Sequence, residues 1–433
     1  MSSKLQISFL DALNDSPSVL PAGYRNNDGN FNNQGNNANL WSASENNSNN
    51  AYNQNFNNDN ANVNQNNNNK NNGFSLRCLQ DSIFSSDASM AEGSFTPSRL
   101  FFLLLKAYKD ARKNKRNTYN QLKFEANYER ELMDLALSIL NRTYEISPSI
   151  CFVNESHVKR EIVAANFKDR VVHHLLFNLI NPIVDKKFIY DCYSCRKGKG
   201  TLFGIYRAQS FARSVTDNFT TEGYVLRLDI SGFFMNINRD ILYAETKRLC
   251  ECNSDLVDYL LKKFIYHNPL ENCIFRSPPT AWEGLPKNKS LRYSPSNCGL
   301  PIGNLTSQLF GNVYLNPLDQ FVKRRLGAKC YGRYVDDMML FSKSRDFLRY
   351  AAREIRHFLK GSLFLDMHPK KVYLQSVHHG FDFLGNRVLP NRLYANDRLR
   401  KNFLDSVGFF GQNRLSVGFA HLASYDGFFS KMT

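Results

Sequence analysis

The sequence lacks an apolar run long enough to cross a membrane. Its 433 residues contain no stretch of about 18 apolar residues, the shortest that would span a bilayer as a helix. Residues 1–14 also lack the basic start and the apolar core of a secretory signal. Both absences predict a cytoplasmic protein without a membrane partner.

The nine cysteines show no disulfide framework, because their number is odd and their spacing is irregular. This pattern favours reduced thiols and excludes a small secreted scaffold. Cys192 and Cys195 have the spacing of half a zinc site, but no second pair stands at ligand spacing. We therefore expect these thiols to be buried or incidental.

Positive charge is scarce in residues 1–97, which hold 4 Lys and Arg against 8 Asp and Glu. Subtracting these from the totals of 55 and 39 leaves 51 against 31 for residues 98–433, a net charge of +20. Such a basic surface suits a phosphate backbone and predicts salt-dependent binding of nucleic acid. A basic protein without a polyanion partner is the alternative interpretation.

Two adjacent acids stand inside the apolar stretch 332–341. Its flanks predict two short strands, with Asp336 and Asp337 at the turn between them. Crowded carboxylates in an apolar setting are costly unless a cation neutralises them. Mg²⁺ does this and also activates phosphoryl transfer, so the pattern favours a metal site over an ordinary surface turn.

A third acid, Asp229, ends the predicted strand 224–230 and is followed by Phe233 and Phe234. Alone, Asp229 would be a strand-end acid that meets solvent. Together with Asp336 and Asp337 it completes a set that can hold two divalent ions around a reacting phosphate.

These segments resemble motifs A and C of reverse transcriptases. Five further segments resemble other blocks of that family, in its order: 160–174, a fingers segment; 194–200; 299–308, motif B; 368–371, motif D; and 381–385, motif E. The resemblance covers residues 98–433. It implies an α+β right-hand polymerase fold, with fingers over 98–222, a palm over 223–390, a fingers insertion at about 276–297 and a small helical thumb over 391–433. The palm is expected to contain an antiparallel sheet.

The resemblance also implies the roles of the site residues. The catalytic set is Asp229, Asp336, Asp337 and Lys370, with Lys371 as an alternative to Lys370. The metal set, for two Mg²⁺ ions with Mn²⁺ as a possible substitute, is Asp229, Ile230, Asp336 and Asp337. The nucleotide set is Arg160, Lys168, Arg170, Phe233, Phe234, Ile302, Gly303 and Gln308, with Phe234 as the steric gate against a 2′-hydroxyl. Phe383, Leu384 and Gly385 would support the primer.

Motif B departs from the common Gln-Gly-X-X-X-Ser-Pro pattern, since Ile302 replaces its Gln and Gln308 replaces its Pro. The resulting pattern resembles the reverse transcriptases of diversity-generating retroelements. That resemblance implies a bacterial or phage-encoded enzyme that copies a template-repeat RNA into cDNA with errors at adenines. Its implied partners are template RNA, a DNA primer, dNTPs and a small basic accessory protein. Alternatives are a retron-type or group II intron-type enzyme without adenine bias, and an inactive RNA-binding protein.

Residues 26–72 include 25 Asn, and such a polar tract cannot bury enough apolar area to offset its ordering entropy. Composition therefore predicts disorder for the Asn-rich segment and linker, residues 1–97. Residues 21–82 also resemble the variable region of retroelement target proteins, which would make them translated template repeat. A binding module is the third interpretation.

Apolar spacing makes further predictions of local structure. We expect helices from Ser98, over 120–140 and over 343–360, and a loop over 276–297.

Overall fold

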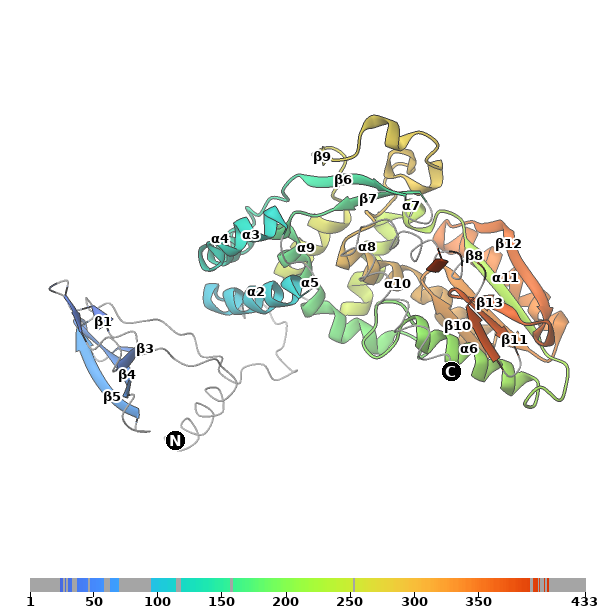
Figure 1. Ribbon diagram of the computed structural model, residues 1–433, viewed down its shortest axis with the longest axis horizontal. Coiled ribbons are helices and arrows are strands. Elements are labelled where there is room, and N and C mark those ends of the chain that lie inside the picture. Colours follow the sequence, from blue (N-terminus) through green and yellow to red (C-terminus); the bar gives the residue numbers. More distant parts are fainter. Residues whose placement is uncertain are drawn as a thin grey trace. The chain divides into compact units, whose positions relative to one another are not determined.

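The computed structural model describes part of the chain: residues 24–25, 28, 30–32, 37–45, 47–57, 63–69, 95–113, 118–155, 159–251, 254–389, 392–395, 397, 401 and 403–404. The chain divides into two compact units, Met1–Ala88 and Ser89–Thr433, each with its own sheets (Figure 1). No helix in these ranges is long and apolar enough to cross a membrane. Most of the predicted thumb, 391–433, lies outside the described residues.

The first unit contains strands where the composition predicted disorder. Strands β1 (Tyr24–Arg25) and β2 (Phe31–Asn32) form one pair, and β3 (Asn37–Glu45), β4 (Asn50–Asn57) and β5 (Val63–Asn69) form an antiparallel sheet. The register sets Ala38 opposite Phe56 and Phe56 opposite Val63, so the few apolar residues recur at matched positions. The ladder also satisfies backbone groups that a polar tract would otherwise leave to water.

Helices begin the second unit. The first of them starts at Pro97, and the Thr96 side chain accepts a hydrogen bond from the Arg99 amide at 3.2 Å, which caps the first turn. The helices of this part are α2 (Pro97–Arg112), α3 (Tyr119–Glu125), α4 (Tyr128–Leu140), α5 (Phe167–Val184), η1 (Asp185–Lys187) and α6 (Thr201–Val215).

The prediction of one helix over 120–140 is wrong, because α3 and α4 are separate. Asn127 between them has φ −138° and ψ 38°, outside the helical region. Phe124 and Leu132 are both buried, whereas Leu122 is 53% exposed. The break lets each short helix turn its own apolar side inward, which a single straight helix would not do.

The second unit contains the expected antiparallel sheet, of order β10-β11-β8-β12. This central sheet lies at the end of the unit away from α2, α3 and α4 (Figure 1). The register pairs Met338 with Leu228 and Met339 with Arg227. Helix α11 packs on this sheet through β8, β11 and β12, while α6 packs on β10 and β11. The strands and this helix are β8 (Tyr224–Ile230), β10 (Cys330–Tyr334), β11 (Asp337–Ser342), β12 (Met367–Ser376) and α11 (Arg345–Leu363).

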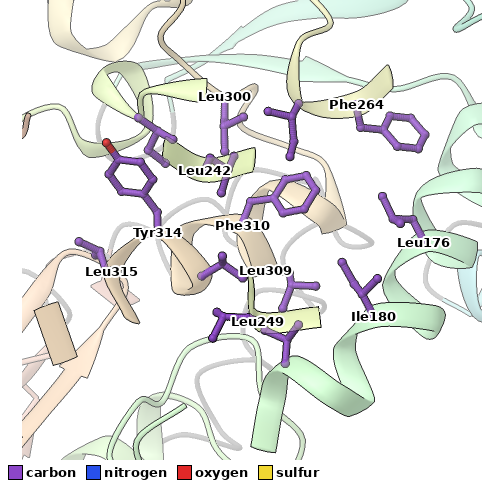
Figure 2. Close-up of a cluster of buried hydrophobic side chains, with 14 of the residues drawn as sticks. Leu176, Ile180, Leu242, Leu249, Phe264, Leu300, Leu309, Phe310, Tyr314 and Leu315 are labelled. Carbon is purple, nitrogen blue, oxygen red and sulfur yellow. The ribbon is translucent and has the colours of Figure 1, made fainter. Parts of the chain in front are cut away.

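Helix α10 (Leu305–Gln320) lies at the centre of the main hydrophobic core. Figure 2 shows its side chains Leu309, Phe310 and Tyr314 in one cluster with Leu176 and Ile180 of α5 and Leu242 and Leu249 of α8. Twelve of its residues are buried on all sides, so an apolar stripe is not visible in its sequence. The other helices here are α7 (Phe233–Asn236), α8 (Arg239–Cys250), α9 (Asp255–Ile265) and the π-helical turn η5 (Phe321–Arg325).

Two smaller sheets flank the central one. One has the order β7-β6-β9, and the other is the antiparallel β13-β14-β15. Their strands are β6 (Ser149–Asn154), β7 (Arg160–Ala164), β9 (Cys273–Phe275), β13 (Phe381–Phe383), β14 (Asn386–Leu389) and β15 (Arg392–Ala395). The predicted loop over 276–297 contains only short 3-10 turns: η2 (Pro279–Trp282), η3 (Lys287–Lys289) and η4 (Leu291–Tyr293), while η6 (Val377–His379) precedes β13.

Candidate active site

The three predicted acids meet at one end of the central sheet. Strands β8 and β11 are antiparallel, and continuing the Met338–Leu228 register by one residue sets Asp337 opposite Asp229. Because side chains alternate between faces, Asp229 and Asp337 share the face of Arg227 and Met339. Asp336 lies in the turn between β10 and β11, as the sequence predicted, and lines the same cavity.

A buried ion pair supports the turn that carries Asp336. Val335 has φ +53°, a conformation that β-branched residues rarely adopt. Arg333 Nη1 donates to the Val335 carbonyl at 2.8 Å, and Arg333 Nη2 and Nε bind the Asp319 carboxylate at 2.6 and 2.8 Å. Tyr331 also donates to Asp319 at 2.7 Å. Arg333 and Asp319 are fully buried, so this pair fixes the turn to α10.

The carboxylates crowd one another electrostatically. Burial, and then the neighbouring Asp229, raise the pKa of Asp336. Burial, followed by Asp336 and Asp229, raises the pKa of Asp337 to about 6. Lys371 Nζ lies 2.7 Å from Asp229 Oδ2 and supplies one compensating charge. Within the described ranges no group of three His, Cys, Asp or Glu side chains is arranged closely enough to coordinate a metal ion as it stands. The excess of charge and the oxygen donors nonetheless match what a divalent cation requires.

This crowding predicts a pH-dependent cost of stability. The folded pKa of Asp337 lies above its unfolded value of about 4, so the cost is absent below pH 4 and is complete above pH 6. Replacing Asp337 with Asn should therefore raise the free energy of unfolding of the metal-free protein by about 2 kcal/mol at pH 7.5. At pH 4 the gain should vanish. Urea denaturation in EDTA at both pH values measures it, and an equal effect at the two would contradict this account.

The acids line a cavity of about 890 Å³. Its wall comes from elements far apart in the sequence: β7, α7, the loop before α10, and the β13–β14 turn. Seven other residues that the sequence singled out line it: Arg160, Phe233, Phe234, Ile302, Phe383, Leu384 and Gly385. The candidate site is thus a single cleft.

Besides Ile230, five other candidates do not line this cavity. Arg170 donates through Nε to the Ala165 carbonyl at 3.0 Å, which makes it a structural residue at the start of α5. Lys168 lies on the same helix turn. Gln308 is exposed and accepts a hydrogen bond from Cys195 Sγ at 3.0 Å. Lys370 is exposed on β12, and its neighbour Lys371 faces the acids instead. The fifth is Gly303.

Gly303 shapes the wall although it does not line it. Its φ of +128° favours glycine, and a Cβ there would lie 3.3 Å from the Val163 carbonyl oxygen. The neighbouring Ile302 carbonyl accepts the Val163 amide at 3.0 Å, so motif B is joined to β7. Ile302 packs against a small apolar cluster that consists of Cys151, Val163, Met235 and Leu291. A side chain at position 303 would therefore strain the backbone and crowd β7.

The two phenylalanines after Asp229 differ in burial. Phe233 is 2% exposed and packs against Tyr314 in the main core, so its packing role is evident. Phe234 is only partly buried, with its ring centroid 5.2 Å from that of Phe233. Ile230, proposed with the metal set, has its side chain in the core and does not line the cavity.

Sequence reasoning missed several cavity residues, among them Asn288 and Lys289 from the loop over 276–297, Arg227 on β8 and Tyr373 on β12. The basic composition of the loop was a signal for Lys289, but nothing local pointed it toward the acids. Arg227 is two residues before Asp229, so the period of a strand could have placed it on the same face.

An antiparallel sheet with three acids at one end of a cleft that basic side chains also line is an arrangement typical of nucleotidyl-transferring polymerases. Residues 154–388 match the family "Reverse transcriptase (RNA-dependent DNA polymerase)", and the chain belongs to that family. It is an RNA-directed DNA polymerase by this match and by its retron relative.

Two curated proteins of Escherichia coli are similar to this chain. Protein YkfC of strain K12 is 24% identical over 308 residues, which cover 63% of this chain and 75% of YkfC. Retron Ec83 reverse transcriptase is 26% identical over 212 residues, 47% of this chain and 61% of the retron enzyme. Among solved structures, the apo telomerase of Candida tropicalis truncated from its C-terminal domain aligns with a TM-score of 0.40 and 11% identity, over 55% of this chain and 52% of that one.

Proposed function

We propose that this cleft extends a DNA primer on an RNA template, with Asp229, Asp336 and Asp337 holding divalent ions, Mg²⁺ or Mn²⁺. The observation that carries the proposal is the crowding of these three carboxylates in one cavity. Burial, and then the neighbouring acids, raise the pKa values of Asp336 and Asp337 there. Bound ions would neutralise that charge and lower the pKa of the primer hydroxyl. Residues 98–222, 223–390 and 391–433 would serve as fingers, palm and thumb.

The other residues of the cleft position the reactants in this proposal. Phe234, partly buried on the floor, would collide with a 2′-hydroxyl and so favour deoxyribonucleotides. Phe383, Leu384 and Gly385 form the β13–β14 turn on the wall and would support the primer end. Lys371, rather than Lys370, lies where a proton could be donated to the departing pyrophosphate.

The test is primer extension by the purified full chain on an RNA template, with Mg²⁺ and with EDTA. We expect DNA products that depend on the RNA sequence and on the divalent ion. Binding of RNA without any extension in either metal would support an inactive RNA-binding protein and would contradict the proposal.

We further propose that the enzyme belongs to a diversity-generating retroelement. Ile302 and Gln308 in motif B support this assignment. The proposed template is then a repeat RNA, copied with errors at adenines with the help of a small basic accessory protein. Residues 21–82 would be translated template repeat, which predicts adenine-rich Asn codons and a near-copy in a neighbouring gene. The similarity to the retron Ec83 enzyme favours a retron-type enzyme as the second candidate.

Replacing Ile302 with Gln should separate these candidates. Ile302 packs among apolar side chains and offers no hydrogen bond to a nucleotide, whereas Gln could orient one. We expect misincorporation opposite adenine to fall roughly tenfold, which corresponds to about 1.4 kcal/mol. Sequencing of the cDNA measures this. Ile274→Gln, at an exposed position outside the cavity, is the matched control. An error spectrum that Ile302→Gln leaves unchanged would refute the role given to Ile302.

A further inference from the structure

The loop over 276–297 forms part of the active-site wall. Asn288 and Lys289, in the short turn η3, line the cavity together with the acids. The loop also lies against the turn that follows Asp229, because a Cβ on Gly232 would lie 3.1 Å from the Asn288 Cβ. The loop over 276–297 therefore lies directly beside the turn that follows Asp229.

A buried carboxylate fixes the loop on both sides of Lys289. Glu161 on β7 is 2% exposed, and its Oε2 accepts from the Leu291 amide at 2.8 Å and the Ser290 hydroxyl at 3.1 Å. Its Oε1 accepts from Trp282 Nε1 at 3.0 Å. Arg292 Nε also lies 3.7 Å from Oε1, so this loop supplies the cation that pairs with Glu161, and Lys289 is not its partner. Glu161 directly follows Arg160, so one short strand positions both the loop and the guanidinium.

Lys289 and Arg160 are two cations that line this cavity. Within the described part of the chain, neither side chain makes an ion pair or a hydrogen bond. Desolvation lowers the pKa of Lys289, and repulsion by Arg160 adds to this, while Asp336 opposes it. Lys289 is partly buried and Arg160 is exposed, so an anion bound between them would relieve their mutual repulsion and offset the desolvation of Lys289.

We propose that Lys289 and Arg160 together bind the triphosphate of the incoming nucleotide. The proposal rests on the proposed polymerase function and replaces Lys168 and Arg170, which do not line the cavity, as the second cationic contact. A polyphosphate is the anion of matching charge, and Arg and Lys are its usual ligands. Glu161 is a positioning residue that acts through the loop.

The variant Lys289→Gln tests the proposal, with Lys287→Gln as the matched control. Lys287 lies in the same turn but does not line the cavity, and its ammonium lies 5.6 Å from the centre of the Tyr293 ring. We expect Lys289→Gln to raise KM for dNTP roughly tenfold, with the Kd for primer–template unchanged. Lys289→Arg should restore most of the loss, and Lys287→Gln should change neither constant. An unchanged KM, or a change confined to the primer–template Kd, would overturn the proposal.

A binding assay without turnover separates this proposal from the polymerase assignment. Inorganic tripolyphosphate should raise the Tm of the wild-type chain and of Lys287→Gln, but have a much smaller effect on Lys289→Gln. If the wild-type chain binds tripolyphosphate in this way yet never extends a primer, the polymerase function fails and the anion site stands. If it extends primers while Lys289→Gln responds like the wild type, the anion site fails alone. Glu161→Gln should also raise KM for dNTP, as Lys289→Gln does, and should affect kcat less.

Discussion

Replacing Asp336 with Asn should lower the rate of primer extension by roughly a thousandfold, equivalent to about 4 kcal/mol in the activation barrier. Asp336 lies in the turn between β10 and β11, beside Asp229 and Asp337. Asn has nearly the same shape as Asp but carries no charge, so it would remove a ligand for the divalent ions without leaving a hole. Single-turnover extension with saturating dNTP measures the loss at the chemical step.

Asp346→Asn is the matched control for that experiment. Asp346 lies on α11 and is 87% exposed at its side chain, and its one ion pair among the described residues is with Arg349 on the same helix. It should leave the rate within about twofold of the wild type. Near-normal extension by Asp336→Asn would exclude this carboxylate from the metal set and would remove the main support for the proposed mechanism.

Replacing Asp319 with Ala should lower the free energy of unfolding by about 3–5 kcal/mol. Both Asp319 and Arg333 are fully buried, with Nη2 and Nε of the guanidinium bound to the two carboxylate oxygens. The remaining Arg333 would keep its charge in an apolar interior without its partner, since Asp319 holds the pKa of Arg333 high against burial. Urea denaturation measures the loss, and Asp346→Ala, at the exposed pair, should cost at most about 1 kcal/mol.

A double variant, Asp319→Leu with Arg333→Met, separates stability from positioning. Replacing both charges with apolar side chains of similar volume should restore much of the stability that Asp319→Ala loses. The Arg333 hydrogen bond to the Val335 carbonyl would still be missing, so the strained turn would lose a support. We therefore expect a folded protein with a lower kcat. A double variant with full activity would show that the ion pair serves stability only.

Several local features were predictable because each depends on short-range chemistry. The mainly apolar run of residues 224–230, and the apolar flanks of Asp336 and Asp337, predicted strands that the structure contains. The Pro-rich and Ser-rich composition of 276–297 predicted a segment without long elements. The strands of the Asn-rich segment were not predicted. Composition describes only an average, whereas the pairing of Ala38, Phe56 and Val63 depends on the register of the strands.

The choice between Lys370 and Lys371 shows where such reasoning ends. Strand β12 pairs with β8 at Met367 and again from Val372, with a register shift between them. A shift of one residue turns every side chain to the other face, so alternation cannot be counted across it. The structure places Lys371 on Asp229 and leaves Lys370 exposed.

The sequence alone determined the chemistry of the cleft, since three acids at predicted strand ends and a basic second unit already favour metal-assisted phosphate chemistry. Only the tertiary structure decided which cations belong to it. Lys289 reaches the acids because Glu161, more than 120 residues earlier, holds its loop, while Arg170 is occupied by the Ala165 carbonyl. Local patterns record the preferences of neighbouring residues. Contacts between distant segments arise only when the packed core brings their backbones together.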